Sequence, residues 1–135
     1  MRSIAILLSV FAFVPLANAE QSSLDDTTIV VPSGQTVSFY ESLMDHPEQD
    51  VMARFRFLAP ELPTRLADMS YQDLEADLAY LCESFALPRL AASDPAMIVI
   101  SLAQAPTEFG TPNPDVAEVF EMYSRDGSTC TWEAF

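Results

Sequence analysis

The segment from Ser70 to Ala86 constrains the fold most strongly, because its apolar residues recur with the period of an amphipathic helix. Ser70 stands where a helix N-cap is expected, with an acidic residue three positions later. We expect the helix to end at Leu87, since a residue before proline avoids the helical region. The stripe predicted to be buried consists of Tyr71, Leu74, Leu78, Leu81, Cys82 and Phe85, and the acids predicted to face solvent are Asp73, Glu75, Asp77 and Glu83.

The beginning of the chain has the pattern of a secretory signal peptide. Arg2 supplies a positive charge, an apolar run from Ile4 to Val14 follows, and Ala17–Ala19 gives an A-x-A cleavage site. The run is shorter than the about 20 residues that span a bilayer, and a buried N-terminal helix explains the charge and the cleavage site less well. The predicted divisions are a signal peptide at residues 1–19, a flexible N-terminus at residues 20–26 and a single α+β domain at residues 27–135.

Two cysteines, Cys82 on the helix and Cys130 near the end of the chain, suit an exported protein with a crosslink. Cysteine pairs in oxidising compartments most often form disulfides, so we predict a bond between these two residues. Two buried free thiols, or a bond between two chains, are the alternatives. Neither cysteine belongs to a C-x-x-C pair or has a basic neighbour, so we expect no redox role.

Acidic residues dominate the charge of the chain. Twenty aspartates and glutamates stand against six arginines and no lysine, which gives a formal net charge of −14. Such a chain repels the backbone of nucleic acids and anionic lipid, so we expect neither as a partner. Basic proteins and cations are compatible with this charge. We therefore expect a soluble periplasmic or secreted protein, with no membrane span after signal cleavage and with an unknown protein or small molecule as its partner.

The remaining periodic segments predict strands on both sides of the helix. Residues 51–58 alternate so that Phe55 and Phe57 face the core while Arg54 and Arg56 face the opposite side. Residues 96–103 are apolar on both faces, as in a central strand. The predicted strands are residues 27–31, 36–40, 51–58, 96–103, 116–125 and 128–135, and the predicted connections are residues 41–50, 59–68, 88–95 and 106–114.

The order of strands, one long helix and further strands predicts an α+β domain. We expect a mainly antiparallel sheet of about five to six strands, with the helix packed on one face. The predicted disulfide ties this helix to the last strand. Asp126-Gly127 supports the final antiparallel pair, because this dipeptide is typical of a β-hairpin turn.

No set of residues stands out as a catalytic, metal or cofactor site. His46 is the sole histidine and lies in a polar stretch without a G-x-S-x-G serine, so we interpret it as a solvated loop residue. A zinc site is not indicated either, because both cysteines are expected to be oxidised. Arg54, Arg56 and Arg89 are candidate anion-binding residues, although ion pairs with the abundant acids are the favoured alternative for them.

These features favour a non-enzymatic binding or accessory protein, and they leave an enzymatic role open. A small hydrolase that uses carboxylates or His46 is the alternative, and it predicts a pocket where such groups converge. A calcium-binding module at residues 45–50 is a weaker alternative. Long loops often carry function. The most informative structural question is therefore whether residues 106–114 and the face with Arg54 and Arg56 border one cavity.

Six segments, taken as a set, carry a family resemblance: VPSGQ (31–35), RFRFLAP (54–60), LCE (81–83), ALPRL (86–90), IVISL (98–102) and CTWEAF (130–135). They resemble a family of small exported bacterial proteins of unknown function. Members of that family are sometimes labelled acetolactate synthase. A chain of this length has no room for the diphosphate- and flavin-binding domains of that enzyme, and it shows no motif for either cofactor. The resemblance therefore implies no catalytic residue.

Overall fold

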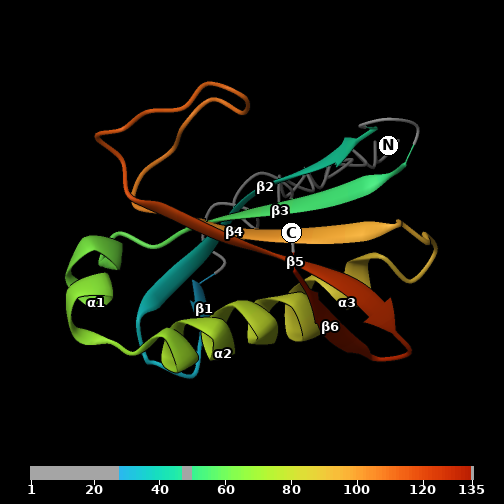
Figure 1. Cartoon of the computed structure of the whole chain (residues 1–135), viewed down its shortest axis with the longest axis horizontal. Helices are drawn as coiled ribbons and strands as arrows, with labels where there is room; N and C mark the ends of the chain where they lie inside the picture. The colour runs from blue at the N-terminus through green and yellow to red at the C-terminus, as the bar shows by residue number, and fades with distance from the viewer. Residues whose placement is uncertain (1–27, 47–49, 135) are drawn as a thin grey trace, which may run out of the picture.

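A computed structural model describes residues 28–46 and 50–134 as a six-stranded sheet with helices on one connection (Figure 1). The predicted signal peptide and flexible N-terminus lie outside the described residues. The strands follow one another across the sheet in sequence order. They are β1 (Thr28–Val30), β2 (Thr36–Asp45), β3 (Met52–Leu58), β4 (Met97–Ala103), β5 (Glu118–Asp126) and β6 (Thr129–Glu133). The prediction of a mainly antiparallel sheet with five to six strands is confirmed.

Strands β3 and β4 form a parallel pair, whereas the other neighbouring strands are antiparallel. A parallel pair needs a long crossover connection, and the helices supply it. They are α1 (Leu62–Asp68), α2 (Tyr71–Leu81), the π-helical turn η2 (Cys82–Ala86) and α3 (Leu87–Arg89). The sheet is strongly twisted into a half-barrel, so the predicted packing of the long helix on one face is not clearly seen (Figure 1).

The long helix begins as predicted and ends later than predicted. The Ser70 hydroxyl accepts a hydrogen bond from the Asp73 backbone, which makes Ser70 the N-cap. Leu87 keeps helical angles although Pro88 follows it, so the predicted end is wrong. In η2 the Leu87 N–H reaches back to the carbonyl of Cys82, which widens the helix and starts a new turn. Pro88 then stands in the first turn of α3, where its missing N–H costs little.

Two predicted connections contain regular structure. Residues 62–68 form α1, whose first turn holds Pro63 at a position that proline favours. Strand β2 extends through Asp45, where we expected a loop. Its pairing shifts between Phe39 and Glu41, which marks a bulge, and beyond the bulge Glu41 lies opposite Arg56 on β3. Pairing of the acids with arginines on the neighbouring strand explains how this polar segment remains a strand.

One hydrophobic core joins the helices to the inner side of the sheet, defined here as the side that carries the buried phenylalanines of β3. Phe85 of η2 lies at its centre, with its ring 4.8–6.3 Å from those of Phe39, Phe55 and Phe57. Cys82 and Cys130 form the predicted disulfide between η2 and β6. The other core residues include Val37, Leu62, Leu74, Leu78, Leu81, Ile98, Ile100, Leu102 and Tyr123.

Two residues of the long helix differ from the predicted stripe. Asp77 was expected in solvent, yet it is fully buried and accepts hydrogen bonds from Ser33 N (2.8 Å), Ser33 Oγ (2.5 Å) and Gln35 Nε2 (2.8 Å). These donors come from the turn between β1 and β2, and they compensate the burial of the carboxylate. Tyr71 was expected in the core, but it is 55% exposed and donates a hydrogen bond to Glu121 on β5.

Candidate functional site

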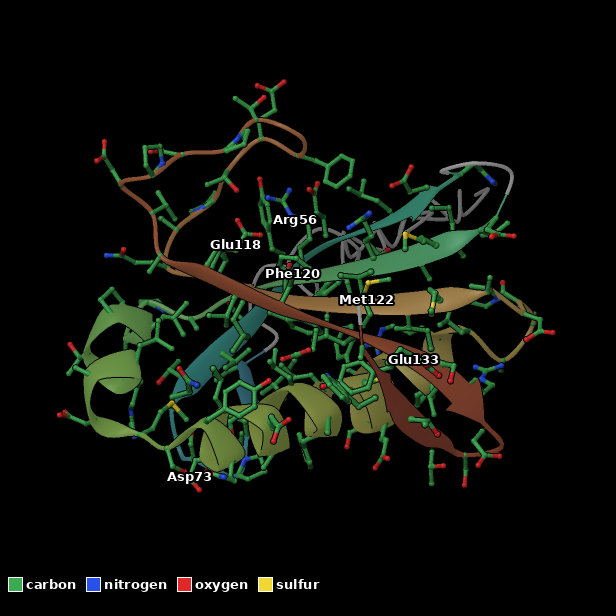
Figure 2. The ribbon with its side chains drawn as sticks, viewed as in Figure 1. Arg56, Asp73, Glu118, Phe120, Met122 and Glu133 are labelled. Carbon is green, nitrogen blue, oxygen red and sulfur yellow. A yellow bond between two sulfur atoms is a disulfide. The ribbon has the colours of Figure 1, made fainter. Side chains whose placement is uncertain are left out.

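The outer side of the sheet, opposite the core, carries the residues that alternate with the core-facing residues along each strand. The register places Arg56, Ser101 and Phe120 in one row across β3, β4 and β5, and it places Arg54 and Val99 in the next row. Arg54 and Arg56 therefore lie on the side opposite the buried phenylalanines, as the alternation predicted. Figure 2 shows Arg56, Glu118 and Phe120 on the part of the sheet nearest the long loop.

That long loop, residues 104–117 between β4 and β5, rises from the sheet at the end of β4 (Figure 1). It contains a tight turn in which the Thr111 N–H donates to the Glu108 carbonyl at 3.1 Å. Gly110 has φ +81° at the third position of this turn, where a type II turn requires a positive φ. The glycine therefore fixes the backbone turn that orients the preceding residue, Phe109.

The two arginines of β3 hold this loop against the sheet. Arg56 Nη2 donates to both the carbonyl and the hydroxyl oxygen of Thr107, each at 2.7 Å. Arg54 places its guanidinium carbon 5.3 Å from the centre of the Phe109 ring, which is a cation–π distance. These contacts position the loop above the outer face of the sheet.

A cavity of about 250 Å³ lies between this loop and the outer face of the sheet. It answers the structural question left open by the sequence, because the long loop and the face with Arg54 and Arg56 border one cavity. The third candidate, Arg89, is not among its lining residues. The lining residues are Arg54, Arg56, Val99, Ser101, Thr107, Glu108, Phe109, Gly110, Thr111, Pro112, Glu118 and Phe120.

Both arginines of the cavity have carboxylate partners. Arg56 Nη1 is ion-paired with Glu41, and Arg54 Nε lies 3.0 Å from Asp45 Oδ2. Arg89 instead lies over the Phe85 ring at 3.3 Å and donates to the Phe85 carbonyl. Ion pairing, the favoured alternative for these arginines, therefore holds for the two that line the cavity, and the structure does not bring all three candidates together.

Ser101 is the most unusual polar residue of the cavity. It is only 7% exposed, and its hydroxyl has no hydrogen-bond partner within residues 28–46 and 50–134. The hydroxyl oxygen is not among the fully buried atoms without a partner, so it is open to the cavity. One weak signal marks this position in the sequence, since Ser101 is the single polar residue of β4. Its place in the cavity depends on the register of three strands.

Two carboxylates, Glu108 on the loop and Glu118 at the start of β5, also line the cavity. Both side chains are exposed, and neither forms an ion pair with a described arginine. Sequence reasoning did not single them out, because nothing in a chain with twenty acids distinguishes these two. Their position follows from the loop, which brings Glu108 back toward the sheet.

The other predicted candidates lie away from this cavity. His46 is exposed just after β2 and does not line the cavity. Asp45, the first acid of the calcium hypothesis, is bound by Arg54, and residues 47–49 lie outside the described residues. Among the residues that the structure describes, no group of three or more histidine, cysteine, aspartate or glutamate side chains is arranged to hold a metal ion.

Comparison with known proteins identifies a family and no function. Residues 10–135 match the model of a family described as "Family of unknown function (DUF6497)". Neither a curated protein nor a solved structure gives a significant match. Within the described part of the chain, the structure contains no helix with the length and apolar character needed to cross a membrane. Any function therefore has to be argued from the cavity itself.

Proposed function

The chain belongs to the DUF6497 family, whose function is unknown, and we propose that it is a non-enzymatic binding or accessory protein with the cavity as its ligand site. The observation that carries this proposal is the unpartnered hydroxyl of Ser101, a largely buried residue, which opens onto a cavity built between the sheet and the long loop. A bound ligand supplies the missing hydrogen bond.

The construction of the cavity supports a preformed site. Arg56 fixes Thr107, and Arg54 lies against Phe109, so the loop is held in place without a ligand. Ligand sites are typically concave, largely apolar and supplied with a few oriented polar groups. The volume is close to the lower limit of such sites, about 300 Å³, which suits a small molecule or one side chain of a partner protein.

The proposed place of action is the periplasm or the extracellular medium. The signal-peptide pattern of residues 1–19 supports export, and the Cys82–Cys130 disulfide is compatible with an oxidising compartment. Intact-mass measurement of the protein recovered from the exported fraction of the native host tests this. We expect a mass lacking the first nineteen residues and a further increase of two hydrogens on reduction; a full-length reduced chain in the cytoplasm contradicts export.

The ligand site is tested by nuclear magnetic resonance with a library of small fragments. We expect one class of fragments to shift the amide signals of Ser101, Phe120 and residues 107–111. The variant Ser101→Val removes the hydroxyl and fills part of the cavity, so these fragments should lose their effect on it. If no fragment shifts the cavity signals of the unmodified protein, the cavity is not a ligand site.

A second candidate function, a small carboxylate-dependent hydrolase, is supported by one observation: Glu108 and Glu118 line the same cavity. Its test is a panel of ester, amide and glycoside substrates with a sensitive chromophore. Turnover that is lost in Glu118→Gln while ligand binding persists supports the hydrolase. The form of this hypothesis that uses His46 needs a second site, because His46 does not line the cavity.

The calcium-binding module is the weakest of the three candidates. Asp45 is already ion-paired with Arg54, so a calcium ion at residues 45–50 has to compete with a guanidinium group. A melting temperature that rises with millimolar calcium supports this module, because a ligand that binds the folded state stabilises it. An unchanged melting temperature eliminates it.

A further inference from the structure

We infer that the cavity accepts a cationic group, an alkylammonium or guanidinium carried on an apolar chain. The same chemistry is presented by a free amine and by a basic side chain of a partner protein. This inference rests on the proposed function and deepens it by naming the ligand class. It differs from the anion-binding role that the sequence suggests for Arg54, Arg56 and Arg89.

The guanidinium groups at the cavity are already paired with carboxylates. Arg56 is 7% exposed, is ion-paired with Glu41, and uses both hydrogens of Nη2 on Thr107. Arg54 donates its Nε hydrogen to Asp45 and directs Nη2 toward the sulfur of Met52. An anion that approaches either guanidinium therefore meets a carboxylate that is already paired with it and that repels the anion.

The remaining charge of the cavity is negative. Glu108 and Glu118 line it without an ion pair to any arginine of the described ranges, whereas the charges of Arg54 and Arg56 are balanced by Asp45 and Glu41. The formal net charge of the whole chain, −14, adds a long-range field of the same sign. Such a field attracts cations and raises their local concentration at a concave surface.

Ser101 gives an independent reason to expect a ligand. The residue is largely buried, its hydroxyl opens onto the cavity without a partner, and a hydroxyl oxygen accepts hydrogen bonds from an ammonium or guanidinium N–H. In the register, Ser101 lies directly beside Phe120 on β5. A ligand that reaches the hydroxyl therefore lies against an aromatic side chain.

The apolar walls fit the rest of such a ligand. Phe109 and Phe120 are about half exposed, and Val99 lies in the neighbouring row of the sheet. The methylene stem of an amine or basic side chain buries apolar surface against these side chains, while the Phe109 ring already carries the Arg54 guanidinium at 5.3 Å. In Figure 2, Glu118 and Phe120 lie near each other on β5, so the carboxylate and the ring meet the ligand from one strand.

The test compares probes of opposite charge and equal length on the full mature protein. Butylammonium and butyrate are titrated separately while the amide signals of Ser101, Phe120 and residues 107–111 are followed. We expect butylammonium to shift these signals and butyrate to leave them unchanged. Two further probes are peptides with one lysine or one acetyl-lysine. If the lysine peptide binds more tightly than butylammonium, the cationic group belongs to a protein partner. If butylammonium binds more tightly than the lysine peptide, it belongs to a free amine.

Variants identify the groups responsible. Removing one charge with Glu118→Gln should weaken butylammonium binding about threefold, and removing the hydroxyl with Ser101→Ala about tenfold. Asp115→Asn is the matched control, because it removes the same charge three residues earlier in the chain than Glu118, at a residue that does not line the cavity. Its effect should be the smallest of the three.

The possible failures are distinguishable. If butyrate shifts the cavity signals in an Arg54-dependent manner and butylammonium does not, the cavity is a ligand site for anions and this inference is wrong. If neither probe shifts them but an uncharged fragment does, the cationic class is wrong and the binding function stands. If nothing binds at the cavity, both proposals fail.

Discussion

A buried aspartate on the inner side of the sheet and a buried serine on the outer side differ in their hydrogen bonding. On the inner side, the carboxylate of Asp77 is fully buried and accepts three hydrogen bonds from Ser33 and Gln35. On the outer side, Ser101 is 7% exposed, and its hydroxyl, which is open to the cavity, has no partner among the described residues. The difference indicates that Asp77 contributes to stability, whereas the hydroxyl of Ser101 is available for a ligand.

The inner side also carries the covalent and aromatic links between the elements. The disulfide joins η2 to β6, and the rings of Phe39, Phe57 and Phe85 contact one another. Its hydrogen bonding is not complete, because Gln35 Oε1 and Arg125 Nε are buried without a partner. Both residues form other hydrogen bonds on the inner side, Gln35 to the Asp77 carboxylate and Arg125 to the Leu87 carbonyl. Each therefore remains part of the hydrogen-bond network that supports the fold.

The largest expected effect is the loss of the disulfide on the inner side. Replacing Cys82 and Cys130 together by alanine should lower the free energy of unfolding by about 4 kcal/mol, because the bond restricts a loop of 48 residues in the unfolded chain. Denaturation in guanidinium chloride measures the change, and reduction of the unmodified protein should produce a similar loss. A loss below about 1 kcal/mol contradicts the view that the inner side holds the fold together.

The next effect concerns the buried carboxylate of the inner side. Asp77→Asn keeps the size of the side chain and removes an acceptor for Ser33 or Gln35, so it should cost about 2–3 kcal/mol of unfolding free energy. Asp73→Asn is the matched control one helical turn earlier, since Asp73 is exposed (Figure 2) and should cost less than about 1 kcal/mol. Equal losses in the two variants contradict a special role for Asp77.

A smaller effect is expected where α2 meets the end of the sheet. Glu121 accepts hydrogen bonds from Tyr71 Oη at 2.7 Å and from Trp132 Nε1 at 2.6 Å. The hydrogen bond to Glu121, followed by burial and the charges of Glu121 and Glu75, raises the pKa of Tyr71 from 10.0 to about 12. The folded-state pKa is above the unfolded one, so this contribution to stability is present below pH 10 and is lost as the pH rises through about 12.

Absorbance titration at alkaline pH measures this effect. Glu121→Gln removes the negative charge, and the pKa of Tyr71 should return toward 10.0. Subtracting the titration of Tyr71→Phe assigns the signal to Tyr71. A Tyr71 pKa that is unchanged in Glu121→Gln shows that the hydrogen bond to Glu121 is not its cause.

The sequence was sufficient to predict most of the secondary structure, because the strands and the helix carry clear periodicity. Residues 51–58 and 96–103 contain the strands β3 and β4, and the cysteine pair predicted the disulfide. The errors share a physical cause, which is partners distant in the sequence. Asp77 is buried because the turn at Ser33 supplies donors, and residues 41–45 form a strand because Arg54 and Arg56 pair with their acids.

The candidate site was predictable only in part. Alternation along β3 placed Arg54 and Arg56 on the outer side, and the proline-rich composition marked residues 106–114 as a long loop. That the loop folds back over those arginines depends on the contacts of Thr107 and Phe109, which no local pattern contains. The role of Ser101 depends on the register of β3, β4 and β5, which the sequence does not specify by itself.

The free energy of unfolding of Ser101→Ala tests the central contrast most directly. Because the hydroxyl has no partner in the folded protein, its removal should change the free energy by no more than about 0.5 kcal/mol, or should increase it, while the affinity for the cavity ligand falls. A loss of about 1 kcal/mol or more shows that the hydroxyl supports the fold. That result contradicts the account, because the outer side would then be organised for stability in the same way as the inner side.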